Sequence, residues 1–285
     1  MARRAVVIGA GGAVGEAIAA RLCGAGVAVL AAMRGSHPDA EQRLRTLGAE
    51  IVKIDLLDDA SFAPALTGAD IVIATPILTL SRRLAGAAQA AGVKRAVFFS
   101  SNNVAVDGES PVYAELRAAE GQVRAALPGA VILRPTLVYG DPRLPALPRL
   151  IRLMRRTPIC PLPGRGKALQ QPVFFEDLAS FAAAAALGAG VEGKTFALGG
   201  PEAMSLKAMY QAVSDAAGGR RLILPVPRWA LLALLAGGVR LPLDSDQVRR
   251  ADVDKLARPV DPPPAAFSPK TPFKAGLVRL ISALT

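Results

Sequence analysis

The sequence predicts an α/β fold in which a doubly wound parallel sheet carries a smaller mixed lobe at its C-terminal side. Three observations support this prediction. Short apolar runs alternate with longer amphipathic segments over residues 1–140, a glycine-rich loop follows the first run, and prolines loosen the pattern afterwards. Strands buried on both faces are continuously apolar, and helical crossovers between parallel strands cover both faces of the sheet.

Six apolar or β-branched runs of three to five residues predict the strands of the first half. They are 5–8, 27–31, 51–54, 71–74, 96–99 and 131–133. The segments between them have lengths and amphipathic patterns typical of helices. These segments are 13–24, 39–47, 59–67, 78–91 and 112–127. We therefore expect a Rossmann-type core over residues 1–140.

The second half, residues 141–285, is expected to form a substrate lobe packed on this core, with 168–200 returning to the core sheet. Helices are predicted at 149–156, 176–188, 205–217 and 228–236, and strands near 170–175, 194–198 and 221–225. An extended segment at 259–272 and a last helix at 273–284 complete the prediction. Trp229 is expected to anchor the 228–236 helix.

Composition excludes several classes of protein. The chain of 285 residues has one His and two Cys, which argues against a zinc site, a disulfide framework and a Ser-His-Asp triad, so we expect no metal. No apolar stretch approaches the roughly 20 residues needed to span a bilayer. We therefore expect a cytoplasmic protein.

The formal charge of +11 is uneven along the chain. Residues 121–180 hold nine basic and three acidic side chains, and residues 181–285 hold thirteen and eight, whereas the first 120 residues are balanced. A neutral first half and a basic second half predict that the second half meets an anionic substrate or partner.

The glycine loop lies between the first predicted strand and the first predicted helix. Its glycines at positions 9, 12 and 15 let the backbone approach a pyrophosphate closely, and the N-terminus of the helix, with Ala13 and Val14, supplies N–H groups and a positive dipole end. The loop thus predicts a dinucleotide site built from Gly9, Gly12, Ala13, Val14 and Gly15. The alternative is a tight turn with close packing between helix and strand.

The residue after the second strand bears on the choice of cofactor. Folds that select NAD place a carboxylate there to bind the ribose 2′-hydroxyl, but this chain has Arg34, which pairs well with a 2′-phosphate. NADP(H) is therefore favoured over NAD, unless Arg34 is a solvated loop residue. Asp55 and Leu56, after the third strand, are expected either to touch the adenine edge or to begin a helix.

Tyr113 and Arg117 form a candidate catalytic pair, because residues four apart share one face of a helix. They follow a strand that ends at Ser100 and Ser101. A second pair of this type, Tyr139 and Arg143, contains Pro142 and is not expected to be helical.

These motifs resemble the extended or atypical short-chain dehydrogenases/reductases, the group that includes nucleotide-sugar epimerases and dehydratases. The resemblance is carried by the glycine loop, the Ser-Ser strand end, the Tyr-xxx-Arg pair and the segments 133–140, 171–177, 196–201 and 267–277. Within the group, the short Ser-to-Tyr spacing and segment 127–135 resemble the accessory subunit of respiratory complex I and its bacterial relatives. Those relatives bind NADP(H), and the mitochondrial subunit is not regarded as a working enzyme.

The resemblance implies roles for three residues. Tyr113 would be the general acid/base, Ser101 would orient a substrate carbonyl, and Arg117 would stand where the family has a lysine that binds the nicotinamide ribose. Arginine keeps the charge but has a different geometry and does not lose its proton. We also expect the cofactor to contact Ala74, Thr75 and Pro76, after the fourth strand, and Pro135, after the sixth.

The basic segment 143–167 contains seven Lys and Arg and no acid. It is expected to bind an anionic substrate group, to contact a membrane surface with 231–235 as its apolar neighbour, or to be a solvated face. Nucleic acid is not expected, because no nucleic-acid motif accompanies the charge. A homodimer is a further possibility.

Together these observations predict an NADP(H)-binding oxidoreductase or epimerase acting on a small molecule, a polar or anionic carbonyl or nucleotide sugar. The alternative is a non-catalytic dinucleotide-binding subunit or sensor of a membrane complex.

Overall fold

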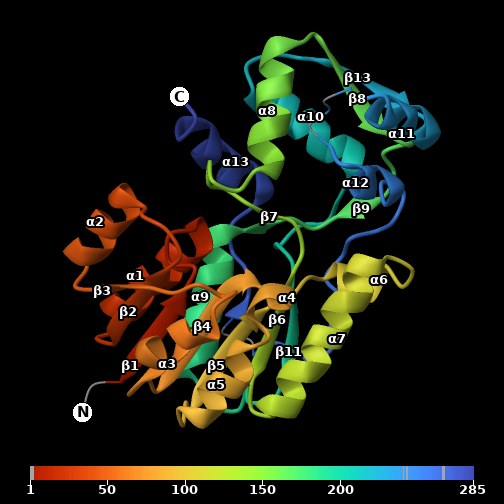
Figure 1. The fold of residues 1–285 in the computed structure, drawn as a ribbon. Helices are drawn as coiled ribbons and strands as arrows, with labels where there is room; N and C mark the ends of the chain where they lie inside the picture. The colour runs from red at the N-terminus through yellow and green to blue at the C-terminus, as the bar shows by residue number, and fades with distance from the viewer. Residues whose placement is uncertain (1–2, 240, 242, 265–266) are drawn as a thin grey trace. The chain divides into compact units, whose positions relative to one another are not determined.

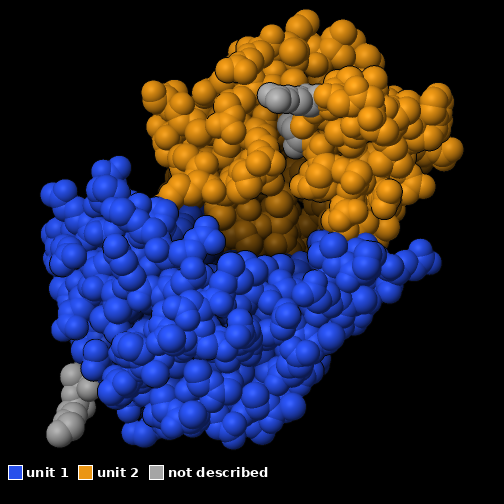
Figure 2. All heavy atoms as spheres, viewed as in Figure 1, with its two compact units in different colours: residues 1–135, 175–198, 258–268 blue, residues 136–174, 199–257, 269–285 orange. Residues whose placement is uncertain are grey.

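A computed structural model of the chain describes residues 3–239, 241, 243–264 and 267–285 (Figure 1). The chain forms two compact units, coloured separately in Figure 2. Unit 1 comprises residues 1–135, 175–198 and 258–268, and unit 2 comprises 136–174, 199–257 and 269–285. The sequence had suggested a division at residue 140 with 168–200 returning to the core.

Unit 1 is built on a seven-stranded parallel sheet in the order β3-β2-β1-β4-β5-β6-β11. The strands are β1 (Arg4–Ile8), β2 (Ala28–Met33), β3 (Glu50–Lys53), β4 (Ile71–Ile77), β5 (Arg95–Phe99), β6 (Val131–Pro135) and β11 (Thr195–Leu198). The strand order reverses between β1 and β4, and ligands of such folds bind outside the strand ends at this point. The predicted doubly wound parallel sheet is therefore confirmed.

Helices cover both faces of this sheet. α1 (Ala13–Gly24), α2 (Pro38–Thr46) and α9 (Phe175–Leu187) pack together, whereas α3 (Phe62–Leu66), α4 (Leu78–Ser81), α5 (Leu84–Ala90) and α7 (Pro111–Ala126) form the other layer (Figure 1). A short helix, α6 (Asn103–Val106), precedes α7, and η1 (Asp59–Ser61) precedes α3. One large apolar cluster joins the sheet to the α3–α7 layer, including Val6, Ile8, Phe98 and Leu116.

Unit 2 combines helices with two-stranded ribbons. Its helices are α8 (Ala146–Arg156), α10 (Leu206–Ala216), α11 (Arg228–Ala236), α12 (Ser245–Arg249) and α13 (Phe273–Ser282). Its strands are β7 (Val138–Tyr139), β8 (Ile159–Pro163), β9 (Leu169–Gln170), β10 (Val173–Phe174), β12 (Met204–Ser205) and β13 (Leu222–Val226). β7 pairs with β10, β9 with β12, and β8 with β13.

Three details differ from the sequence predictions. The helix expected at 78–91 is broken into α4 and α5. The proline-rich β8 was not expected as a strand, because proline lacks a backbone donor; a two-stranded ribbon tolerates it at its outer edge. The expectation for Trp229 was wrong, since its side chain is 74% exposed and Leu231 is the buried residue of α11.

The two units differ in charge. Unit 2 contains 18 Lys and Arg against 7 Asp and Glu, a net charge of +11, whereas unit 1 contains 16 of each and is neutral. The whole excess positive charge of the protein therefore belongs to unit 2. Within the described ranges, no helix combines the length and the apolarity that crossing a membrane requires.

Candidate functional site

The predicted site residues of unit 1 follow the carboxyl ends of six neighbouring parallel strands. The glycine loop follows β1, Arg34 follows β2, Asp55 and Leu56 follow β3, and Ser100 and Ser101 follow β5. Ala74, Thr75 and Pro76 lie in the C-terminal half of β4, and Pro135 is the last residue of β6. Because the strands are parallel, these residues all lie along one edge of the sheet.

The glycine loop is held tightly against the end of β4. Gly9 has φ +81°, and a Cβ added there would lie 2.4 Å from Thr75 Oγ1. Thr75 Oγ1 also donates to the carbonyl oxygen of Ile8, at 3.0 Å. A Cβ on Gly15 would lie 2.3 Å from the carbonyl oxygen of Gly9, so the first turn of α1 rests directly on the loop.

The N-terminus of α1 is open to an anion. Its N-cap is Gly12, whose added Cβ would approach only the Gly9 carbonyl oxygen, at 3.4 Å, and no side chain among the described residues caps the helix. The first-turn N–H groups, including those of Ala13 and Val14, have no acceptor further back in the helix. Together with the helix dipole, they suit the pyrophosphate of a dinucleotide.

The side chains of Arg34 and His37 lie next to this loop. Arg34 is exposed at the end of β2, and no carboxylate of the described chain pairs with it. His37 is also exposed, but its ring packs over the loop, because a Cβ on Gly11 would lie 2.7 Å from His37 Cδ2. The contact of His37 with Gly11 joins residues far apart in the sequence, so it could not be deduced from spacing.

Asp55 is engaged in a local turn. Its Oδ1 accepts a hydrogen bond from the N–H of Leu57 at 3.0 Å, and its own N–H donates to Ser61 Oγ. The helix-capping role falls to Asp58, whose side chain accepts from the N–H of Ala60 in η1. A contact of Asp55 or Leu56 with adenine stays a prediction.

Tyr113 is buried in the first turn of α7, and Asn103 donates to it. The distance from Asn103 Nδ2 to Tyr113 Oη is 2.7 Å. Ser101 is brought to the same place, since its Oγ accepts from the N–H of Asn103 at 3.2 Å. The structure therefore joins the two predicted residues Tyr113 and Ser101 through Asn103, which the sequence analysis did not single out.

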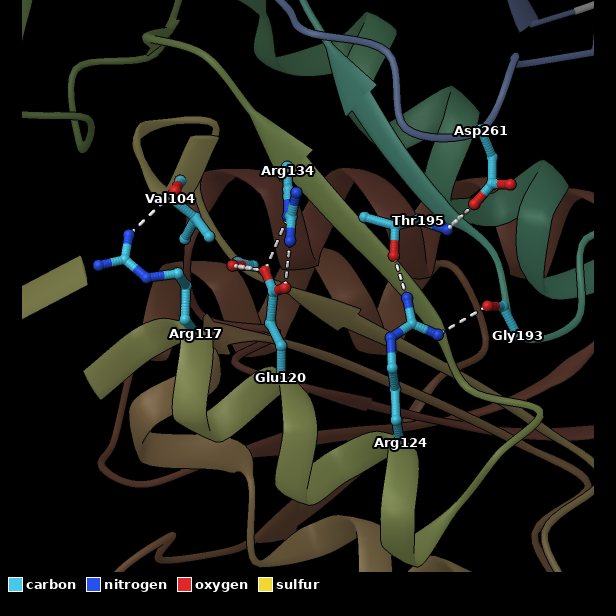
Figure 3. Close-up of polar contacts among 9 residues, drawn as sticks. Val104, Arg117, Glu120, Arg124, Arg134, Gly193, Thr195 and Asp261 are labelled. Carbon is cyan, nitrogen blue, oxygen red and sulfur yellow. Dashed lines mark hydrogen bonds and ion pairs between the residues drawn. The ribbon is translucent and has the colours of Figure 1, made fainter. Parts of the chain in front are cut away.

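Arg117 extends from α7 towards the α6–α7 connection. Its Nη1 donates to the carbonyl oxygens of Val104 and Asp107, and its Nη2 to that of Gly108, each at 3.0 Å. Figure 3 shows the bond to Val104. Three of the five guanidinium N–H groups are thus used on backbone carbonyls. These bonds fix α6, which begins at Asn103, and the connection after it, so Arg117 acts on the site through the backbone.

A buried ion pair supports the strand ends beneath the site. Glu120 of α7 accepts from Ser100 Oγ at 2.5 Å and from Arg134 Nε at 2.9 Å, and its second oxygen is bonded to Arg134 Nη2 (Figure 3). The side chain of Glu120 is 7% exposed. A carboxylate this buried requires a cation and further donors, and Arg134 and Ser100 supply both.

Farther along the same helix, Arg124 ties α7 to the edge strand β11. It donates to the carbonyl oxygen of Gly193 at 2.7 Å and to Thr195 Oγ1, while the N–H of Thr195 donates to Asp261 Oδ2 at 2.8 Å (Figure 3). Arg117, Glu120 and Arg124 therefore anchor α7 at three levels to the strands and loops beside it.

Unit 2 contains polar groups that its fold does not fully satisfy. Gln170 is buried, and its Nε2 has no acceptor among the described residues. Residue 170 forms a β-bridge with Lys255, and burial, reinforced by Arg250, lowers the pKa of Lys255 to about 8. A partly buried cation beside an unsatisfied donor is suited to an anionic group. Within the described ranges, no cluster of His, Cys, Asp or Glu could hold a metal ion.

Comparison with known proteins agrees with this architecture. Residues 1–126 match the model of the NmrA-like family. The chain is 28% identical over 275 residues to the Arabidopsis thaliana protein "NADH dehydrogenase [ubiquinone] 1 alpha subcomplex subunit 9, mitochondrial", covering 87% of the chain and 68% of that relative. It is 29% identical over 222 residues to a Streptomyces griseus (4-alkanoyl-5-oxo-2,5-dihydrofuran-3-yl)methyl phosphate reductase, covering 75% and 73% of the two chains.

The fold is also similar to that of solved enzymes. The structure of the Citrobacter sp. triphenylmethane reductase complexed with NADP(H) superposes with a TM-score of 0.76 at 20% identity, covering 96% of this chain and 98% of that one. That similarity concerns the fold. The sequence matches agree with the resemblance of the motifs at the strand ends to extended short-chain dehydrogenases/reductases.

Proposed function

We propose that the protein is an NADP(H)-dependent oxidoreductase that reduces a polar or anionic carbonyl compound. The observation that carries the proposal is the open N-terminus of α1, at the switch point of the sheet, next to an exposed Arg34. Backbone N–H groups there would bind the pyrophosphate, and the guanidinium would pair with a 2′-phosphate, which NAD lacks.

The residues after β5 could supply the proton that the reduction of a carbonyl requires. When bound, the nicotinamide supplies the hydride. Tyr113 would donate its proton to the carbonyl oxygen, while Asn103 donates a hydrogen bond to the phenol oxygen. The same hydrogen bond from Asn103 stabilises the phenolate that remains. Ser101 Oγ accepts from the N–H of Asn103, and its own O–H, which has no acceptor among the described residues, would orient the carbonyl.

Arg117 is proposed as a positioning residue. Its bonds to the carbonyls of residues 104, 107 and 108 hold α6, the helix that begins at Asn103, and the connection that follows it. The anionic character of the substrate is supported by the net charge of +11 of the chain. The Streptomyces griseus relative, whose name specifies a phosphate-bearing substrate, is consistent with this.

The cofactor proposal predicts a selective thermal shift. NADP⁺ should raise the Tm more than NAD⁺ at equal concentration, because only NADP⁺ offers a phosphate to Arg34. Arg34→Asp should reverse that order by repelling the phosphate and accepting from the ribose hydroxyl. Arg45→Asp, an exposed position on α2, should leave the order unchanged. Equal shifts with both cofactors would remove the argument from Arg34.

Turnover gives the second test. With NADPH and a panel of phosphorylated, carboxylated and neutral carbonyls, Tyr113→Phe should lower kcat by about 10²–10⁴-fold and leave the Kd for NADPH nearly unchanged. Arg117→Lys should lower kcat together with the Tm, since lysine cannot bond three carbonyls in one plane. If NADPH binds but no compound of the panel is reduced, the non-catalytic alternative is favoured. The Arabidopsis thaliana relative, named as a subunit of NADH dehydrogenase, is consistent with that alternative.

A further inference from the structure

An apolar surface lies on unit 2, on the ribbon formed by β8 and β13. Ile159 pairs with Leu222 and Pro161 with Leu224, so these side chains share one face of the ribbon. Ile159 is 47% exposed, Leu222 57% and Leu224 40%, whereas Cys160 and Leu162 on the opposite face are fully buried. One face of the ribbon is therefore buried in the core of unit 2, and the other face exposes apolar side chains to solvent.

The helix that follows the ribbon along the chain also exposes apolar side chains. Eight of the nine residues of α11 are apolar, yet only Leu231 is buried. Trp229, in the first turn, is 74% exposed, and it is the single tryptophan of the protein. A helix that is apolar around its whole circumference normally belongs in a core or a membrane interface. We refer to Ile159, Leu222, Leu224 and Trp229 as the ribbon patch.

Arginines lie at one end of this patch. Arg155 and Arg156 are the last residues of α8, shortly before β8, and Arg220 and Arg221 directly precede β13. Because the strands are parallel, both pairs lie near the same end of the ribbon. The N–H of Leu222 donates to the carbonyl oxygen of Pro158, and Arg221 Nε donates to that of Met154. These bonds hold the segment before β13 beside the segment before β8.

The cationic end is not neutralised by the protein. Arg149, Arg152, Arg155 and Arg156 are all exposed on α8, whose apolar side is buried. No carboxylate in the described part of the chain pairs with these four or with Arg220. Exposed apolar side chains next to unpaired cations form a surface that complements a layer of anionic headgroups over hydrocarbon.

We propose that the ribbon patch and the arginines beside it bind the surface of an anionic lipid bilayer. Trp229 and the outer side chains of β8 and β13 enter the headgroup boundary, and the guanidinium groups at the end of α8 contact lipid phosphates. Insertion of apolar side chains and attraction between basic residues and anionic lipids each give only weak binding, but the two together give stable peripheral attachment. This inference is independent of the proposed reaction, because none of its residues belongs to the candidate site of unit 1.

The experiment uses the full chain and the fluorescence of its one tryptophan. Vesicles of phosphatidylcholine with about one third phosphatidylglycerol should shift the emission of Trp229 to shorter wavelength and should sediment the protein. Pure phosphatidylcholine should do neither, and brominated acyl chains should quench the emission. Because this measurement needs no variant, it does not depend on whether a variant folds. Unchanged emission and no sedimentation with the anionic vesicles would overturn the proposal.

Two pairs of variants locate the surface. Arg155→Gln/Arg156→Gln should weaken partitioning by about 25-fold, at about fivefold for each arginine, and Arg45→Gln/Lys53→Gln on unit 1 should have little effect. Ile159→Ser/Leu222→Ser should weaken it at least about tenfold, whereas Leu47→Ser/Leu80→Ser, with similar exposure on unit 1, should not. If the unit 1 and unit 2 variants lost binding equally, the attachment would be a general charge effect and the ribbon patch would be excluded. Binding to an acidic protein with no response to vesicles would likewise exclude it.

Discussion

Replacing Glu120 with alanine is expected to lower the free energy of unfolding by about 3–5 kcal/mol, the range found when one partner of a buried ion pair is removed. The loss arises because Arg134 would remain buried without a counter-charge and Ser100 would lose its acceptor. Urea unfolding followed by circular dichroism measures the change.

The same helix provides the control. Glu115 of α7 is paired with Arg82, but its side chain is 60% exposed, so Glu115→Ala should cost at most about 1 kcal/mol. The double variant Glu120→Leu/Arg134→Met should recover much of the loss, because it removes both charges together. If Glu120→Ala and Glu115→Ala proved equally mild, the buried network would not contribute to stability as described.

Gly15→Ala is expected to weaken dinucleotide binding by at least about 100-fold and to lower the free energy of unfolding by about 2 kcal/mol or more. The added Cβ would lie 2.3 Å from the Gly9 carbonyl oxygen, which is backbone and cannot move without displacing the loop. Isothermal titration with NADPH and urea unfolding report the two effects separately.

Gly24→Ala is the matched control at the other end of α1. No atom lies within 4 Å of its added Cβ, so alanine should be neutral or should stabilise the helix by up to about 1 kcal/mol, with binding unchanged. A Gly15→Ala protein that bound NADPH as tightly as the parent would show that the loop does not hold the pyrophosphate.

The sheet could be predicted because its strands are buried on both faces and their sequences are continuously apolar. The six runs of the first half and the strand expected near 194–198 correspond to β1 to β6 and β11. β8 could not be predicted in the same way, since its prolines argue against a strand, and α6 is too short to show a helical period. Apolarity alone also gave the wrong environment for Trp229, because it does not tell a core from an exposed patch.

For the candidate site, the sequence indicated which side chains follow the strand ends, since loop position depends on local pattern. It did not indicate the partners of Tyr113 and Arg117, which depend on how α6 is placed against α7. One feature of the sequence does indicate the buried ion pair of Glu120. Glu120 lies on the face of α7 that contains Leu116 and Val123, and a carboxylate on a buried face requires a cation from elsewhere in the chain.

The assembly of unit 1 from three separate segments has a consequence for how the protein is made. β6 is complete at Pro135, but its outer neighbour β11 begins at Thr195, and Asp261, which bonds to the N–H of Thr195, comes later still. A nascent chain therefore exposes the hydrogen-bonding edge of β6 for the whole time that residues 136–194 are synthesised. Such pairings between distant segments form slowly, and open strand edges are prone to aggregate. A chain ended at residue 140 should accordingly be insoluble when expressed alone, although it contains every residue of the glycine loop.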